Sequence, residues 1–508
     1  MCKLCENGQH QNHSGSSRRD FLKIAGGAGV AAAVLSSFKS PSLAAEKANQ
    51  TNSALPRNTG QAGKRYLIRG GAVLSMDAKV GDFAKADVLV EGKKILEVRP
   101  NINAGDAEVI DAAGKIVMPG FIDTHHHQFE TALRSYLPNA LLDKDGKPHG
   151  TVNYMDYVQG KFSPVYKPED VYISELFGSL SQLDAGVTTV HDMSQIHHTP
   201  ANSDAAVKGL MDSGRRAVLS FSQSQGNKPR FADDARRLKK QYFSSKDQLI
   251  TMIIAGEIYA PDYEDTWKIA RSLNLPIASH VVGPGMSAAF AAIARGGKLG
   301  RDNLLIHMTG IDDESWKITA DSGAKISMAV PIEMAMRHGT PPIMKTLSLG
   351  IEPSLSVDVE CTMTADFFTQ MRGAFTLQRM LVNEAALKGE SNVPELLTAR
   401  DVIRFATQNG ANDLWLGDKI GSLTPGKEAD IILLDATALN VAPLNNVPGA
   451  VVTLMDRSNV ETVIVAGKIR KWKGKLLDAD IPKLASEITA SRDRIFAAAK
   501  IQPNLFGN

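Results

Sequence analysis

The sequence predicts an α/β fold: a (β/α)8 TIM-like barrel inserted into a small β-sandwich that the N- and C-terminal segments form together. Two observations predict it. Through the middle of the chain, short apolar runs alternate with helical stretches, which is typical of a parallel sheet covered by helices. On either side of that region, strands of alternating polarity are separated by glycine-containing turns, which is typical of a small β-sheet unit.

The barrel is expected over residues 120–416. Its eight strands should be largely apolar, because both faces of a closed parallel sheet are covered. The expected strands are Phe121–Thr124, Thr188–His191, Ala217–Ser220, Ile250–Ala255, Ile277–His280, Leu304–His307, Lys325–Met328 and Ser354–Asp358.

The composite β-sandwich is expected from residues 65–119 together with residues 417–475. Residues 46–64 are polar and predict a linker, and residues 476–508 predict a tail with an exposed helix from Ile481 to Lys500. The expected sandwich strands are Tyr66–Arg69, Asp87–Glu91, Lys94–Val98, Val109–Asp111, Lys115–Met118, Ala429–Leu434, Val460–Ala466 and Lys468–Trp472.

Residues 1–45 have the parts of an export signal. A basic pair, Arg18-Arg19, precedes a small-residue apolar run from Ile24 to Leu35, and a small-residue site near Ala44-Ala45 follows. The arginine pair with Phe-Leu resembles the twin-arginine signal, which predicts export machinery as a partner and a periplasmic mature protein with no membrane anchor. The alternative, a membrane anchor, is disfavoured because the apolar run is short. Cys2, Cys5, His10 and His13 precede this signal and mimic a zinc-finger spacing.

Composition excludes several classes of function. Of 508 residues, 43% are hydrophobic and 22% charged, an ordinary globular balance. The net charge of +2 supplies no basic field for nucleic acid, and acidic or membrane-surface partners are not implied either. Cys361 is the one cysteine beyond the signal, so the mature chain needs no disulfide.

The first chemical signal is a histidine pair at the end of an apolar strand. Side chains alternate along a strand, so His125 and His127 should point to one side and His126 to the other. Two imidazoles on one side can share a metal ion. The end of a barrel strand is also where catalytic groups gather.

Three later residues end barrel strands in the same way. His280 ends the fifth expected strand, His307 the sixth and Asp358 the eighth. A carboxylate placed after an apolar strand is costly unless a cation accompanies it. Together these side chains predict a metal site.

The string from Val117 to His127, VMPGFIDTHHH, resembles the opening signature of the amidohydrolase superfamily. Gly186–Val190, His280, His307, Asp358 and the turn from Gly421 match that pattern in order, and the resemblance is nearest to cytosine and guanine deaminases and triazine hydrolases. It implies that His125, His127, His280 and Asp358 bind one divalent ion, Zn²⁺ ahead of Fe²⁺, and that similar proteins form homodimers. His307 would polarise the substrate or carry a proton.

The resemblance implies a hydrolase that uses metal-activated water to attack an sp² carbon of a small nitrogen-containing heterocycle, breaking a C–N or related bond. Asp358 would take the proton of that water and pass it to the leaving group. An alternative is hydrolysis of an amide, urea, carbamate or cyclic amide. A further alternative is a metal-free binding protein on the same fold.

One position departs from the pattern. Deaminases of this branch place a glutamate three residues after the fifth-strand histidine, to protonate a ring nitrogen, and here Gly283 stands there. Glu257, after the fourth strand, is the candidate substitute. Three readings stay open for it: it bridges a second metal held by His280 and His307, it contacts substrate, or it pairs with an arginine.

Other residues that follow strands are weaker candidates for the pocket. Gln128 and His338 are expected to contact substrate, Arg134 either lines the pocket or forms an ion pair, and Cys361 is expected to pack. The remaining candidates are Phe129, Glu130, Gln195, His197, His198, Glu333, Met336 and Gly339.

Overall fold

The computed structural model describes residues 54–245 and 247–506. The expected export signal, its cleavage site and the N-terminal cysteines and histidines lie outside the described residues. These described residues belong to one compact unit. No helix in the described part of the chain combines the length and the apolar character that crossing a bilayer requires.

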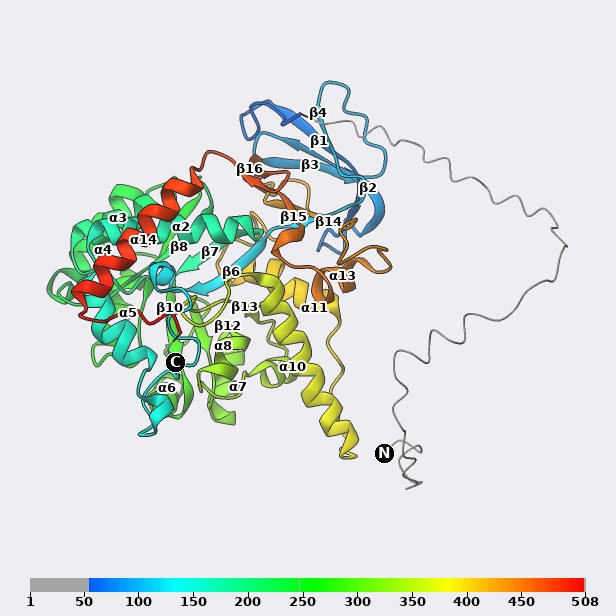
Figure 1. The fold of residues 1–508 in the computed structure, drawn as a ribbon. Coiled ribbons are helices and arrows are strands. Elements are labelled where there is room, and N and C mark those ends of the chain that lie inside the picture. Colours follow the sequence, from blue (N-terminus) through cyan, green and yellow to red (C-terminus); the bar gives the residue numbers. More distant parts are fainter. Residues whose placement is uncertain (1–53, 246, 507–508) are drawn as a thin grey trace, which may run out of the picture. The chain divides into compact units, whose positions relative to one another are not determined.

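Eight parallel strands form the barrel sheet, in the order β13-β12-β11-β10-β9-β8-β7-β6, so neighbours along the chain are neighbours in the sheet (Figure 1). This confirms the predicted (β/α)8 fold. All eight expected strands are present. They are β6 Phe121–His126, β7 Val187–Asp192, β8 Arg216–Ser222, β9 Ile250–Ala255, β10 Ile277–Val281, β11 Asn303–His307, β12 Lys325–Met328 and β13 Ser354–Leu355.

The barrel closes where its last strand meets its first. β13 ends at Leu355, earlier than expected, but the chain stays beside β6 through a bridge between Asp358 and His126. The Asp358 N–H donates to the His125 carbonyl at 2.9 Å, and the His127 N–H donates to the Asp358 carbonyl at 2.8 Å. This seam places Asp358 directly beside the histidine pair.

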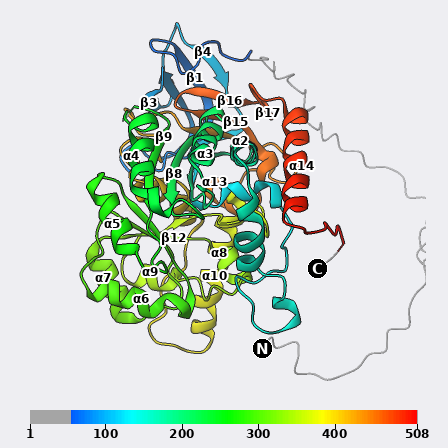
Figure 2. The ribbon, with the colours of Figure 1, turned by 90° about the vertical axis from the view of Figure 1, so that its left-hand side faces the viewer.

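Helices cover the outside of the barrel sheet, as Figure 2 shows around β12. Local sequence sets their ends: Thr199 caps α3 through a bond from the Asn202 N–H, and Gly323 ends α7 in a left-handed conformation. The helices are α2 Pro168–Asp184, α3 Pro200–Asp212, α4 Phe231–Tyr242, α5 Tyr263–Ser272, α6 Gly283–Arg295, α7 Asp313–Ser322, α8 Val330–Ala335, α9 Ile343–Ser348, α10 Phe367–Leu387, α11 Ala399–Arg404, α12 Gly410–Asp413, α13 Val447–Thr453 and α14 Ile481–Ala498.

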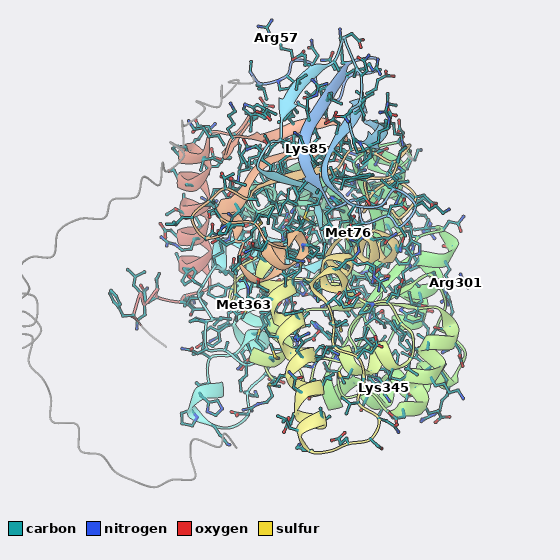
Figure 3. The ribbon with its side chains drawn as sticks, turned by 90° about the vertical axis from the view of Figure 1, so that its right-hand side faces the viewer. Arg57, Met76, Lys85, Arg301, Lys345 and Met363 are labelled. Carbon is teal, nitrogen blue, oxygen red and sulfur yellow. The ribbon has the colours of Figure 1, made fainter. Side chains whose placement is uncertain are left out.

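The terminal segments join in one mixed nine-stranded sheet, ordered β17-β16-β15-β14-β5-β1-β2-β3 with β4 beside β1. In Figure 3, Lys85 on β2 marks this sheet and Lys345 on α9 marks the barrel. Its strands are β1 Arg65–Val73, β2 Phe83–Glu91, β3 Lys94–Arg99, β4 Glu108–Asp111, β5 Lys115–Pro119, β14 Ile431–Asp435, β15 Val460–Val465, β16 Lys468–Trp472 and β17 Lys475–Leu476.

A buried arginine ties the mixed sheet to the barrel. Arg216, at the start of β8, donates to both carboxylate oxygens of Asp430, at 3.0 and 3.1 Å, and to Glu428 at 2.8 Å. Bidentate pairing of this kind fixes geometry as well as charge. The C-terminal helix α14, drawn in red in Figure 1, is also anchored on the barrel, because Ser491 and Arg494 both bond to Asp170 of α2.

Candidate metal centre

The histidine pair of β6 lies where the alternation of the strand predicts. The rings of His125 and His127 lie side by side, with centroids 4.7 Å apart, and each approaches Asp358 Oδ1 through Nε2, at 3.1 and 3.6 Å. His126 instead lies beside Asp123, 3.5 Å away. The pair and the carboxylate therefore share one small volume inside the barrel mouth.

His280, on β10, completes the group. Its Nε2 lies 3.2 Å from His125 Nε2 and 3.3 Å from His127 Nε2. Ligand atoms about 2.1 Å from a single tetrahedral zinc ion lie about 3.4 Å apart. The separations of 3.1 to 3.6 Å among these four side chains fit that value.

The hydrogen bonds made by Nδ1 of His127 and His280, on the side of each ring away from the cluster, indicate the state of the Nε2 atoms that face it. His127 donates its Nδ1–H to the Met193 carbonyl at 2.9 Å, and His280 donates its Nδ1–H to Glu257 at 2.7 Å. In the neutral form of each ring, Nε2 therefore carries a lone pair. Lone pairs and a carboxylate that converge in a buried site could hold a metal cation between them.

The protonation states agree with that conclusion. Burial lowers the pKa of His125 well below its ordinary value and that of His127 to about 3, so both imidazoles are neutral. Burial raises the pKa of Asp358, but the hydrogen bond with His125 and the adjacent imidazoles outweigh it and hold that pKa well below its usual range. Neutral imidazoles and an ionised carboxylate are the forms that bind metal.

His307 and His338 lie on the other side of Asp358. His307 Nε2 is 3.7 Å from Asp358 Oδ2, and its Nδ1–H donates to Glu333 at 3.1 Å. The His338 ring lies 4.7 Å from that of His307, and neither of its buried nitrogens has a hydrogen-bond partner among the described residues. Burial lowers the pKa of each of these two histidines to about 4.

The contacts of Glu257 differ from all three interpretations that the sequence suggested for it. It contacts His280 on the ring edge remote from the metal cluster, through Nδ1, so it does not bridge His280 and His307. Glu257 is absent from the cavity lining. Among the described residues it forms an ion pair with His280 and not with an arginine. Burial lowers the pKa of His280, but the Glu257 carboxylate outweighs this and raises it.

Gln128 also lies away from the cavity, contrary to the expected substrate contact. A short 3-10 helix, Gln128–Leu133, follows the strand and directs this side chain toward α2. Its amide donates to Glu175 and Ser179 and accepts from Arg215. These bonds use the polar atoms of Gln128 in a buried network.

A cavity of about 580 Å³ opens over the cluster, a size that suits a small organic ligand. His127, His280, His307, His338 and Asp358 lie at its inner end. The polar side chains in its lining, here called the polar wall, are Tyr154, Gln159, Gln195 and Tyr259, and Asp143 and Arg337 add two charged side chains. The apolar side chains in its lining are Leu142, Met155, Val282, Met286, Met336 and Val359.

Three side chains of the polar wall are linked by hydrogen bonds. Gln159 donates to Gln195 at 2.6 Å and to the Tyr154 hydroxyl at 3.1 Å, and that hydroxyl donates to Glu130 at 2.6 Å. Sequence reasoning found Gln195 but missed Tyr154, Gln159 and Tyr259. The first two lie in the long connection between β6 and α2, where no strand end marks them.

Four other residues that the sequence suggested for the pocket make structural contacts instead. Arg134 forms an ion pair with Glu360 at 2.7 Å. His197 contacts the Ser203 hydroxyl and His198 donates to the Ser163 carbonyl, and neither lines the cavity. Cys361 is fully buried, and burial raises the pKa of its thiol well above the usual value, so it packs as an inert side chain.

Fold and site together define a (β/α)8 barrel protein with a cluster of histidines and one aspartate, at the carboxyl ends of its strands, that could hold a metal ion. The model of the Amidohydrolase family matches residues 116–470, so the chain belongs to the amidohydrolase family. This confirms the sequence-based expectation of an amidohydrolase-type enzyme.

Two relatives match this chain over nearly their whole length. The chain is 26% identical over 460 residues to 5'-deoxyadenosine deaminase of Methanosarcina mazei, covering 85% of this chain and 98% of the relative. It is 26% identical over 445 residues to 5-methylthioadenosine/S-adenosylhomocysteine deaminase of Caldicellulosiruptor saccharolyticus, covering 83% and 96%.

Solved structures share the fold. An adenosine deaminase from Xanthomonas campestris with bound zinc superposes with a TM-score of 0.74 at 22% identity, over 86% of this chain and 100% of that one. Atrazine chlorohydrolase from Arthrobacter aurescens, complexed with zinc, gives a TM-score of 0.73 at 20% identity, over 84% and 100%. Similarity at this level establishes the fold alone.

Proposed function

We propose that this protein is a metal-dependent hydrolase that removes an amino group, or a related leaving group, from an sp² carbon of a small nitrogen-containing heterocycle. The observation that carries this proposal is the convergence of His125, His127, His280 and Asp358, with separations that suit one zinc ion, at the inner end of a cavity. The deaminase names of the relatives supply the reaction class.

A divalent ion held by these ligands, Zn²⁺ ahead of Fe²⁺, would lower the pKa of water toward neutrality and so supply the nucleophile. Asp358 has a second carboxylate oxygen, Oδ2, that faces His307 rather than the histidine pair. That oxygen can accept the proton of the attacking water and return it to the leaving group. His307 is suited to stabilise negative charge that develops on the substrate.

Substrate contacts are proposed for two residues at the inner end of the cavity and for its polar wall. His338 presents unpaired nitrogens to a buried space, so a substrate with a donor or acceptor at that point would satisfy them. The amides of Gln159 and Gln195 can read the edge of a heterocycle, while the methionine-rich wall suits an apolar substituent.

A second candidate function is hydrolysis of an amide, urea, carbamate or cyclic amide. The observation that favours it is Gly283, which stands where a ring-protonating glutamate would be expected. Its backbone has φ of +56°, and a Cβ there would lie 3.1 Å from the His338 carbonyl oxygen. A glutamate at this position would therefore be strained in the present backbone.

Product analysis separates the two functions. Zinc-loaded enzyme should be incubated with adenosine, 5'-deoxyadenosine, 5-methylthioadenosine and atrazine, and in parallel with ureas and cyclic amides. Release of ammonia or another leaving group from the first set supports the proposal. A carboxylic acid product from the second set, with nothing released from the first, would replace it with the second function.

Export by the twin-arginine route, cleavage near Ala44-Ala45 and a periplasmic location are also proposed, on the pattern of residues 18–45 alone. Mass spectrometry of the mature N-terminus and cell fractionation test this, and a mature chain that still begins at Met1 would exclude cleavage. Homodimer formation is proposed from the resemblance and is tested by light scattering.

A further inference from the structure

The backbone around Glu257 is fixed by the strand that precedes it. β9 ends at Ala255, but Gly256 continues the pairing with β10 because its N–H donates to the Ala278 carbonyl at 2.8 Å. A Cβ on Gly256 would lie 2.5 Å from the Trp267 ring, so this close approach requires glycine. The strand register therefore delivers Glu257 to the side of His280.

Glu257 uses both carboxylate oxygens on that single residue. Oε1 accepts the Nδ1–H of the His280 ring at 2.7 Å, and Oε2 accepts the His280 backbone N–H at 3.1 Å. The side chain is 9% exposed, and no lysine or arginine in the described part of the chain forms a salt bridge with it. Burial of a carboxylate without a cation is costly, so the presence of Glu257 here requires an explanation.

The two bonds fix what His280 presents to the cluster. With the ring proton held on Nδ1, the lone pair lies on Nε2, which faces His125 and His127. The ring is also held stacked on that of His127, with planes 5° apart. A histidine that ligates a metal is oriented and made more basic in this way by a carboxylate on its outer nitrogen.

We infer that Glu257 is a positioning residue that sets the metal affinity of the site through His280, and that it neither binds the metal nor contacts the substrate. The inference rests on the metal centre of the proposed function. It deepens that proposal by assigning a distinct task to a residue outside the ligand set.

The chain contains a matched control. Glu333 Oε1 accepts the Nδ1–H of His307 at 3.1 Å and the Ala329 N–H at 2.9 Å. In both pairs a buried carboxylate accepts the Nδ1–H of a histidine, and the two histidines lie on the neighbouring strands β10 and β11, although Glu257 uses both oxygens and Glu333, on α8, uses one. They differ in that His280 belongs to the four-residue ligand set and His307 does not. Replacement of Glu333 by Gln should therefore leave the metal bound.

The test is the zinc dissociation constant of the full enzyme, measured by competition with a chromophoric chelator, for wild type, Glu257→Gln and Glu333→Gln. Gln at 257 offers one acceptor where His280 presents two donors. The loss should weaken zinc binding by about 10- to 100-fold, while Glu333→Gln should change it by less than about threefold. The absorption spectrum of the Co²⁺ form should also change in Glu257→Gln.

Unfolding of the metal-free proteins separates positioning from a structural role. Metal-free Glu257→Gln leaves one His280 donor without its acceptor, so its unfolding temperature should fall slightly, while its zinc affinity falls about 10- to 100-fold. Zinc affinity within about threefold of wild type, or an equal loss in Glu333→Gln, would overturn the inference while leaving the proposed function standing. Failure of the wild type itself to bind zinc would instead refute the proposed function and the inference with it.

Discussion

Glu130 allows a quantitative test of how this protein buries charge next to its cavity. The side chain is fully buried and accepts the Tyr154 hydroxyl proton at 2.6 Å, while its other oxygen has no hydrogen-bond partner among the described residues. Burial raises the pKa of this carboxyl from 4.5 to about 8. The perturbation is Glu130→Gln, which keeps the shape and the acceptor for Tyr154 but cannot ionise.

The sign follows from proton linkage. Between pH 4.5 and about 8 the folded protein keeps the Glu130 proton that the unfolded chain has lost, so the contribution of Glu130 to stability falls as pH rises. A shift of about 3.5 units at about 1.4 kcal/mol per unit gives an upper limit of about 5 kcal/mol. Glu130→Gln should therefore be more stable relative to wild type at pH 8 than at pH 5.

Denaturant unfolding of both proteins, saturated with zinc, at pH 5, 6, 7, 8 and 9 measures this difference directly. The unfolding free energy of Glu130→Gln minus that of wild type should rise from pH 5 to 8 and level off by pH 9. A difference in unfolding free energy that stays constant across this range would refute the reasoning, because it would mean that Glu130 is ionised in the folded state throughout.

Three further outcomes are expected. His125→Ala should abolish turnover and lower the zinc content measured by plasma mass spectrometry, with circular dichroism unchanged; zinc at one equivalent would contradict the ligand assignment. Asp358→Asn should lower kcat by at least about 10²-fold, since it removes the proton acceptor; steady-state kinetics on zinc-loaded protein measures this. Arg216→Met should cost about 3–5 kcal/mol of unfolding free energy, because Asp430 and Glu428 would lose their buried cation. An unfolding curve equal to that of wild type would show that this contact adds nothing.

The positions of the proposed ligands can be predicted from the sequence because strand geometry determines them. Alternation along β6 separates His125 and His127 from His126, and the shared direction of the barrel strands brings His280 and His307 to the same mouth. Neither inference needs a loop conformation. The expected barrel strands and the C-terminal helix α14 are present for the same reason, since period and apolar content determine them, although some bounds differ, as at β13, which ends at Leu355 and not at Asp358.

Residues beyond the strand ends are harder to predict. Gln128 turns away because a 3-10 helix starts directly after His127, and the sequence carries no marker for that turn. Glu257 depends on the register between β9 and β10, which places its carboxylate on the outer nitrogen of His280. The polar wall depends on a connection of irregular structure that brings Tyr154 and Gln159 back over the cavity. Tertiary packing determines all of these positions.

The closing seam of the barrel and the assembly of the metal centre depend on the same hydrogen bonds. Asp358 has φ of +69° and His307 φ of +72°, left-handed conformations that cost a non-glycine residue about 1–2 kcal/mol each. Asp358 is held there because its N–H and carbonyl both pair with β6, at 2.9 and 2.8 Å. Those two bonds close the barrel sheet and set the carboxylate against His125. A barrel that failed to close would therefore lose the ligand that completes the site, so metal binding should depend on an intact seam.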